Sequence, residues 1–187
     1  MEHSRTTYLT KTHTKLFWPV LIAAPLLLAI AWGPYLPAEV YTFLRFARGM
    51  AEGAGVALDV VGEFPAPALD SPLFAFLVSV PARIGVDPSW AALLFSAAGW
   101  IVAAFALLAV GQSIKRLDGA MIAALLLSFN PAIITTLGSA ASWIVAFGWL
   151  TIALLLRRRY VIAIFTFLLF VALLIPWPPT GGFSHLG

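Results

Sequence analysis

Five long apolar segments constrain this chain more than any other feature, because each approaches the length that a helix needs to cross a lipid bilayer. They cover residues 16–36, 89–113, 120–137, 141–156 and 160–177. The first segment has 21 residues and would rise about 30 Å as a helix, which matches the hydrocarbon core of a membrane. Hydrophobic residues make up 61% of the chain and charged residues only 10%, whereas charged residues make up about a quarter of a soluble domain. The sequence therefore predicts an all-α integral membrane protein with about five transmembrane helices in one domain, 16–177.

The residue types that are scarce exclude several function classes. The net charge is only +3 and is spread along the chain, so no nucleic-acid partner is expected. Cysteine is absent and the three histidines, His3, His13 and His185, lie near the termini, so no metal site is expected. No carboxylate lies within a predicted span, which disfavours a pump or an ion transporter. The expected partners are membrane lipids and other membrane protein subunits.

The distribution of basic residues predicts how the chain is oriented. Cytoplasmic connections of membrane proteins are enriched in lysine and arginine. If five segments cross, eight of the eleven basic residues lie in the cytoplasm and six of the eight acidic residues lie outside. The chain then has a cytoplasmic N-terminal segment, 1–15, an outer loop, 37–88, and an outer C-terminal tail, 178–187. We expect a multi-pass protein of the cell inner membrane.

The apolar stretch 72–85 is the main source of an alternative topology. It is short and is interrupted by Pro81 and Arg83. If it crossed the membrane, the basic groups at 115–116 and 157–159 would both lie outside, against the positive-inside rule. We therefore expect a re-entrant or interfacial helix on the outer side, with six spans as the alternative. A cleaved signal peptide is the alternative for the first apolar segment, although the run is long for one and no Ala-x-Ala site follows it closely.

Residues 38–52 predict an amphipathic helix in the outer loop. Apolar residues recur there at helical spacing on one side, and the opposite stripe consists of Tyr41, Arg45, Arg48 and Glu52. Two glycines shortly after this stretch are expected to end the helix. One interpretation is a solvated charged face with an Arg48–Glu52 pair. The other is that Arg45 and Arg48 hold a lipid phosphate, since the guanidinium fork matches phosphate geometry.

A family resemblance begins in this same stretch. The run 37–56, PAEVYTFLRFARGMAEGAGV, resembles the first-loop motif of the C-type (GT-C fold) membrane glycosyltransferases, in their mannosyl- and arabinofuranosyltransferase-like branch. Ser-Pro-Leu-Phe at 71–74, Gly-Val-Asp-Pro at 85–88 and Asn-Pro-Ala at 130–132 are similar to later motifs of that family, in the same order. The resemblance covers residues 16–170. It implies a GT-C-like N-terminal transmembrane module whose outer face meets a polyprenyl-phosphate sugar donor.

The resemblance also implies roles for particular residues. Glu39 is the candidate catalytic base, which would take the proton of the acceptor hydroxyl as it attacks the sugar. Arg45, Arg48 and Tyr41 are the candidate ligands of the donor phosphate or of a lipid headgroup. The family has two acidic residues at this point, and the first of them falls on Ala38. A single carboxylate is a poor divalent-cation site, because hard cations take several oxygen ligands.

Other acidic positions of the family are replaced as well. Its Glu-Gly-Tyr falls on Pro67, Ala68 and Leu69, and its glutamate after the third spanning helix falls on Ala140 or Ala141. Family members also have more spans than the five expected here. These departures favour a non-catalytic accessory or structural subunit of a larger membrane complex.

Two other functions stay open. The first is an active glycosyltransferase, completed by a separate chain, that moves a sugar from the polyprenyl-phosphate donor to a lipid or polysaccharide acceptor on the outer face. The second is an unrelated helical bundle that binds lipid or assists assembly. No cofactor other than that donor is expected.

Asn130–Pro131 lies in the middle of the apolar segment 120–137. The expected effect is a helix kink, with Asn130 bonding a freed carbonyl group or a neighbouring helix. The other interpretation is that Asn130 contacts a ligand or a lipid.

Overall fold

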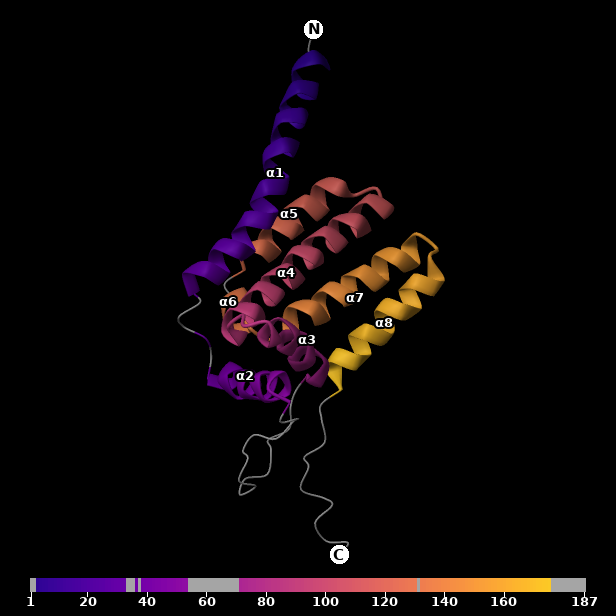
Figure 1. Ribbon diagram of the computed structural model, residues 1–187. Coiled ribbons are helices and arrows are strands. Elements are labelled where there is room, and N and C mark those ends of the chain that lie inside the picture. The colour runs from indigo at the N-terminus through magenta and orange to yellow at the C-terminus, as the bar shows by residue number, and fades with distance from the viewer. Residues whose placement is uncertain (1–2, 33–35, 37, 54–70, 131, 176–187) are drawn as a thin grey trace, which may run out of the picture.

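The computed structural model describes residues 3–32, 36, 38–53, 71–130 and 132–175, and in this part of the chain all regular secondary structure is helical (Figure 1). The fold class is therefore all-α. The helices are α1 (His3–Trp32), α2 (Ala38–Ala51), α3 (Pro72–Arg83), α4 (Pro88–Ser113), α5 (Leu117–Ser128), α6 (Ala132–Thr136), α7 (Ala141–Leu156) and α8 (Tyr160–Leu174).

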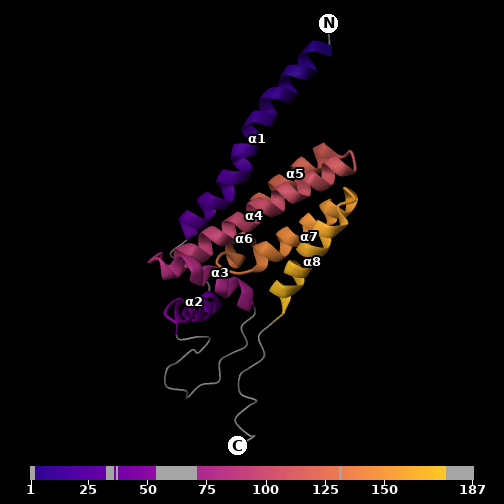
Figure 2. The ribbon, with the colours of Figure 1, turned by 45° about the vertical axis from the view of Figure 1, so that its right-hand side comes forward.

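Helix α4 is the centre of the bundle. It packs against α1, α3, α5 and α7, and α7 in turn packs against α8. Two helical hairpins result, α4–α5 and α7–α8, which lie side by side in both views (Figures 1 and 2). The first part of α1 extends beyond the other helices.

Helix α4 is also the one helix, in the part of the chain described above, that is long enough and apolar enough to cross a membrane. Residues 17–31 of α1 and the helices α3, α5, α7 and α8 are apolar but shorter. Large apolar side chains are nevertheless exposed along the bundle, most of all on α8, where Val161 is 82% and Phe165 is 62% exposed. Exposed apolar side chains that adjoin one another are typical of a membrane or protein interface.

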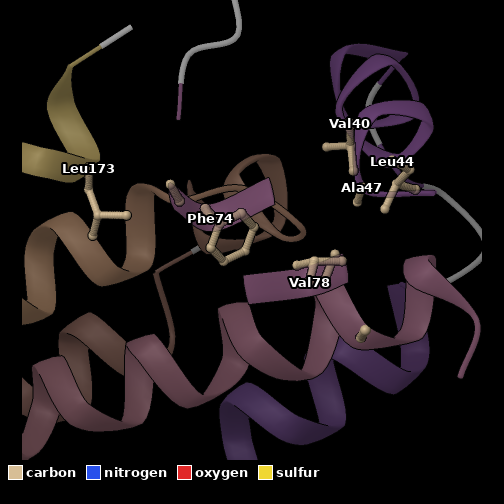
Figure 3. Packing of buried hydrophobic residues seen from close by; sticks show 9 residues of the cluster. Val40, Leu44, Ala47, Phe74, Val78 and Leu173 are labelled. Atoms are coloured by element: carbon tan, nitrogen blue, oxygen red, sulfur yellow. The ribbon is translucent and has the colours of Figure 1, made fainter. Parts of the chain in front are cut away.

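Helices α2 and α3 form a cap over the end of the bundle that lies away from the α4–α5 and α7–α8 turns. The cap packs through a cluster of buried apolar residues from α2, α3, α4 and α8, which include Val40, Leu44, Ala47, Phe74, Val78 and Leu173 (Figure 3). Helix α3 contacts α4 and α8 of the bundle and α2 of the cap, so it joins the cap to the bundle.

The apolar segment 120–137 forms two helices and not one kinked helix. Helix α5 ends at Ser128 and α6 begins at Ala132. Between them the Asn130 amide donates to the Leu127 carbonyl group at 3.3 Å, and the Ile133 amide donates to the Asn130 carbonyl group at 2.9 Å. The residue before a proline is disfavoured in helical conformation, and proline itself has no N–H to donate. Pro131 itself lies outside the described residues.

Polar side chains also bond across the packed helices. The Trp143 indole Nε1 of α7 donates to the Phe95 carbonyl oxygen of α4 at 2.9 Å. The Thr151 and Thr166 hydroxyl groups lie 3.0 Å apart in a buried hydrogen bond between α7 and α8. In a lipid bilayer, burial of apolar side chains gives helices little tendency to associate, and hydrogen bonds of this kind help to join them.

The α4–α5 and α7–α8 turns have the same backbone structure. The Arg116 amide donates to the Gly111 carbonyl and the Arg159 amide donates to the Leu154 carbonyl, at 2.8 and 2.9 Å. These are the long-range bonds of the Schellman motif, in which the residue after the helix adopts a left-handed conformation. That residue is Lys115 in the first turn and Arg158 in the second, with φ of 59° and 57°.

A residue with a Cβ atom is strained at such a position, and glycine is not. We therefore expect Lys115→Gly to be more stable than Lys115→Gln by about 0.5–1 kcal/mol, and Arg158→Gly to exceed Arg158→Gln similarly. Both variants in each pair lack the basic charge, so the difference in their stability reports the strain of the left-handed backbone. Thermal unfolding in a neutral detergent measures it, and equal stability within each pair would contradict the assignment of the turns.

Candidate functional site

The outer-loop helix predicted over 38–52 is α2, and it is amphipathic as expected. Val40, Leu44 and Ala47 are buried on one side, whereas Tyr41, Arg45, Arg48 and Glu52 are exposed. The apolar side packs against α3 and the bundle. Protein therefore covers this side of the helix.

The buried side of α2 is wider than the sequence predicted. Phe46, between the exposed Arg45 and the buried Ala47, is only 1% exposed and packs against Ala75 of α3. Phe43 stacks on Phe74 with ring centroids 5.1 Å apart. Helix α3 therefore contacts two neighbouring rows of side chains on α2, one that includes Phe43 and one that includes Phe46. The single apolar stripe in the sequence predicts only one of these rows.

Arg48 is already engaged within α2. Its Nε atom lies 3.0 Å from the Glu52 Oε1 atom, one helical turn away, and the two side chains are 73% and 63% exposed. An exposed pair of this kind contributes only about 0.3–0.5 kcal/mol to stability. The pair therefore orients Arg48 without binding it strongly, and another anion could replace the Glu52 carboxylate at small cost.

Arg83, at the end of α3, reaches the end of α2. Its Nη2 atom donates to the Met50 carbonyl oxygen at 3.3 Å. Carbonyl groups in the last turn of a helix lack partners within the helix, and a cation is favoured there. The end of α2 is completed by Gly53, which has a φ of +81°. Sequence reasoning did not identify Arg83 as a site residue, because its partner lies 33 positions away.

A cavity of about 430 Å³ lies where the ends of α2 and α3 meet the start of α4. It is lined by Arg48, Ala51, Glu52, Ala82, Arg83, Gly85, Val86, Asp87 and Pro88. The Asp87 carboxylate is engaged as the N-cap of α4, since Oδ1 accepts a hydrogen bond from the Ser89 amide at 2.7 Å. Two guanidinium groups and two carboxylates belong to the residues that line the cavity, so its lining carries no net formal charge.

The structure brings few of the expected site residues together. Arg48 lines the cavity, whereas Arg45 and Tyr41 are exposed elsewhere on α2. Glu39 lies in the first turn of α2, but its side chain is outside the described part of the structure. Asn130 lies in the α5–α6 connection.

The other acidic positions of the resembling family are not restored by the fold. Ala140 and Ala141 lie at the start of α7, and residues 67–69 are outside the described residues. Across the described helices and turns, histidine, aspartate and glutamate form no group of three or more that could hold a metal ion.

Comparison of the chain with protein-family models, with curated proteins and with solved structures returns no significant match.

Proposed function

We propose that this chain is a five-span membrane protein that serves as a non-catalytic accessory subunit of a larger membrane complex, with the α2–α3 cap on the outer side. The basic turns at 115–116 and 157–159 then lie in the cytoplasm with the N-terminus. Residues 72–85 do not cross in this arrangement. The accessory role is based on the resemblance of this chain to the N-terminal module of the C-type glycosyltransferases.

The separation of charge along the bundle supports the membrane part of the proposal. The two turns with five basic residues lie at one end, and the cap lies at the other (Figure 1). Exposed apolar side chains occupy the helices between them. Basic residues at one end of an apolar bundle are the arrangement that the positive-inside rule favours.

The accessory role rests on one observation above all, which is that three charged groups in and beside the cap are engaged by the chain itself. Arg48 pairs with Glu52, Arg83 donates to the Met50 carbonyl oxygen, and Asp87 caps α4. Each of these contacts stabilises a helix end or a helix face. A site that transfers a sugar keeps a carboxylate directed at the reacting hydroxyl, and Glu39 is the remaining candidate.

The second candidate function is an active sugar transferase that a partner chain completes. The cavity beside Arg48 and Arg83 favours it, because paired guanidinium groups are suited to the donor phosphate. Glu39 would act as the base and the acceptor site would come from the partner. The donor would be a polyprenyl-phosphate sugar.

Sugar transfer in isolated membranes separates the two functions. The variant is Glu39→Gln, and the matched control is Glu52→Gln on the same helix, which removes a carboxylate without touching the candidate base. An accessory subunit predicts unchanged transfer in both variants and a stoichiometric partner on mild purification. Loss of transfer in Glu39→Gln alone would overturn the accessory role and establish the active one.

A further inference from the structure

The α4–α5 and α7–α8 turns together carry a dense group of positive charge. Lys115 and Arg116 lie in the first turn and Arg157, Arg158 and Arg159 in the second, and all five side chains are exposed. In the part of the chain that the structure describes, none of the five has an ion-pair partner. The one acidic residue beside them is Asp118, in the first turn of α5.

A direct contact holds the two turns together. The Arg157 Nη2 atom donates to the Gln112 Oε1 atom at 3.0 Å, and Arg157 Nε donates to the Ser113 hydroxyl oxygen at 3.4 Å. Gln112 and Ser113 form the end of α4, so the two hairpins are joined at this end. The four remaining cations, Lys115, Arg116, Arg158 and Arg159, therefore lie in two turns that this contact holds side by side.

The backbone of these turns does not explain why basic residues occupy them. Lys115 and Arg158 each stand in a left-handed position that glycine adopts without strain. A cation does interact favourably with the last turn of a helix, and one per helix end is enough for that. Five exposed cations at one end repel one another, and an anion bound between the two turns would relieve this repulsion.

The side chains next to the bases indicate what kind of anion this is. Ile114, Leu117, Leu156, Tyr160 and Val161 adjoin the basic residues in sequence and are exposed by 53%, 41%, 47%, 58% and 82%. These five residues form an apolar collar next to the basic residues. A soluble phosphate or a nucleic acid bound at the basic residues would gain no contact from this collar. A lipid combines a charged headgroup with apolar acyl chains, so it can contact both the basic and the apolar side chains.

We infer that the two turns form a single binding site for the headgroup of an acidic phospholipid in the cytoplasmic leaflet. The phosphate oxygens lie between Lys115–Arg116 and Arg158–Arg159, and the acyl chains follow the apolar collar. Arg157 keeps the two halves of the site together through Gln112. The inference rests on the proposed membrane arrangement for the choice of leaflet, but the site itself is defined by the turns.

Lipid binding to the full chain in neutral detergent tests the site without reference to orientation. The probes are short-chain phosphatidylglycerol and phosphatidylcholine, and bound lipid is counted by native mass spectrometry. We expect the wild-type chain to retain phosphatidylglycerol at least tenfold better than phosphatidylcholine. Removing two charges with Lys115→Gln and Arg158→Gln should weaken this binding roughly 30-fold, at about fivefold per charge.

Two further variants make the test specific. Arg5→Gln with Lys11→Gln removes the same charge from the start of α1, outside the two turns, and should leave lipid binding unchanged. Lys115→Gly with Arg158→Gly should lose the lipid as the glutamine variant does, even though the turns are relieved of strain, so loss of binding cannot be ascribed to unfolding. Binding should also weaken in 0.5 M salt, because exposed charges are screened there.

Equal binding by the wild type and the Lys115→Gln, Arg158→Gln variant would overturn the proposal. So would displacement of the lipid by millimolar inorganic phosphate, which would reveal a site for a free anion. Neither result bears on the accessory role or the orientation of the chain, which the sugar-transfer and labelling experiments test separately.

Discussion

Replacing Phe74 by alanine should detach the α2–α3 cap from the bundle, at a cost of about 3–5 kcal/mol in the free energy of unfolding. Phe74 is fully buried, stacks on Phe43 of α2 and belongs to the cluster that joins the cap to α4 and α8. Figure 3 shows its ring with Leu173 of α8 on one side and Val78 and the residues of α2 on the other. Truncation removes the ring from the cluster in which α2, α3, α4 and α8 pack together, so the loss includes both burial and a cavity.

The matched control lies two residues further along α3. Phe76 is 51% exposed, so Phe76→Ala removes the same atoms without opening the core. Thermal unfolding in detergent measures both variants, and labelling of a cysteine placed at the buried Ala47 reports whether the cap has opened. Equal losses for the two variants would show that Phe74 does not hold the cap.

Replacing Gly99 by alanine should separate α4 from α7. An ideal Cβ atom at Gly99 would lie 2.5 Å from Ser142 Oγ and 2.9 Å from Ser142 Cβ, which is closer than real atoms approach. Ser142 is fully buried and cannot swing its Cβ atom aside, so the helices must move apart. Overpacking of this kind costs about 1–3 kcal/mol.

Gly119→Ala is the control for Gly99→Ala. A Cβ atom at Gly119 would meet nothing within 4 Å, and the residue is in the first part of α5. Alanine favours the helix over glycine by about 1 kcal/mol, so this variant should be slightly more stable than the wild type. Thermal unfolding of both variants tests the packing, and a Gly99→Ala variant as stable as Gly119→Ala would show that α4 and α7 are not in close contact there.

Local pattern in the sequence predicted most of the helices well. The apolar segment 141–156 has the same bounds as α7, and 89–113 differs from α4 by one residue. Both segments end in a polar or basic turn, so composition marks the ends. Segment 120–137 differs because α5 ends at Ser128, shortly before a proline in the sequence, and α6 begins only at Ala132.

The contacts that define the candidate sites could not be predicted in the same way. Arg83 contacts Met50, which lies 33 positions away in the sequence, and Arg157 contacts Gln112, which lies 45 positions away. No pattern within a short stretch of sequence predicts these two contacts. The stripe of Arg45 and Arg48 was predicted as exposed, and it is. Only the fold shows that Arg48 lines a cavity with Arg83 and that Arg45 does not.

Single-cysteine labelling in intact cells tests the orientation of the chain in the membrane most directly. The chain has no cysteine, so each introduced thiol is the only one. The positions are Val86, in the α3–α4 turn, and Asp118 and Arg158, at the opposite end of the bundle. All three are exposed.

We predict that a membrane-impermeant maleimide labels Val86→Cys in intact cells and labels Asp118→Cys and Arg158→Cys only after the cells are permeabilised. The six-span topology predicts the reverse, because a crossing at 72–85 would place the two basic turns outside. Labelling of Asp118→Cys in intact cells, with Val86→Cys protected, would contradict the five-span arrangement.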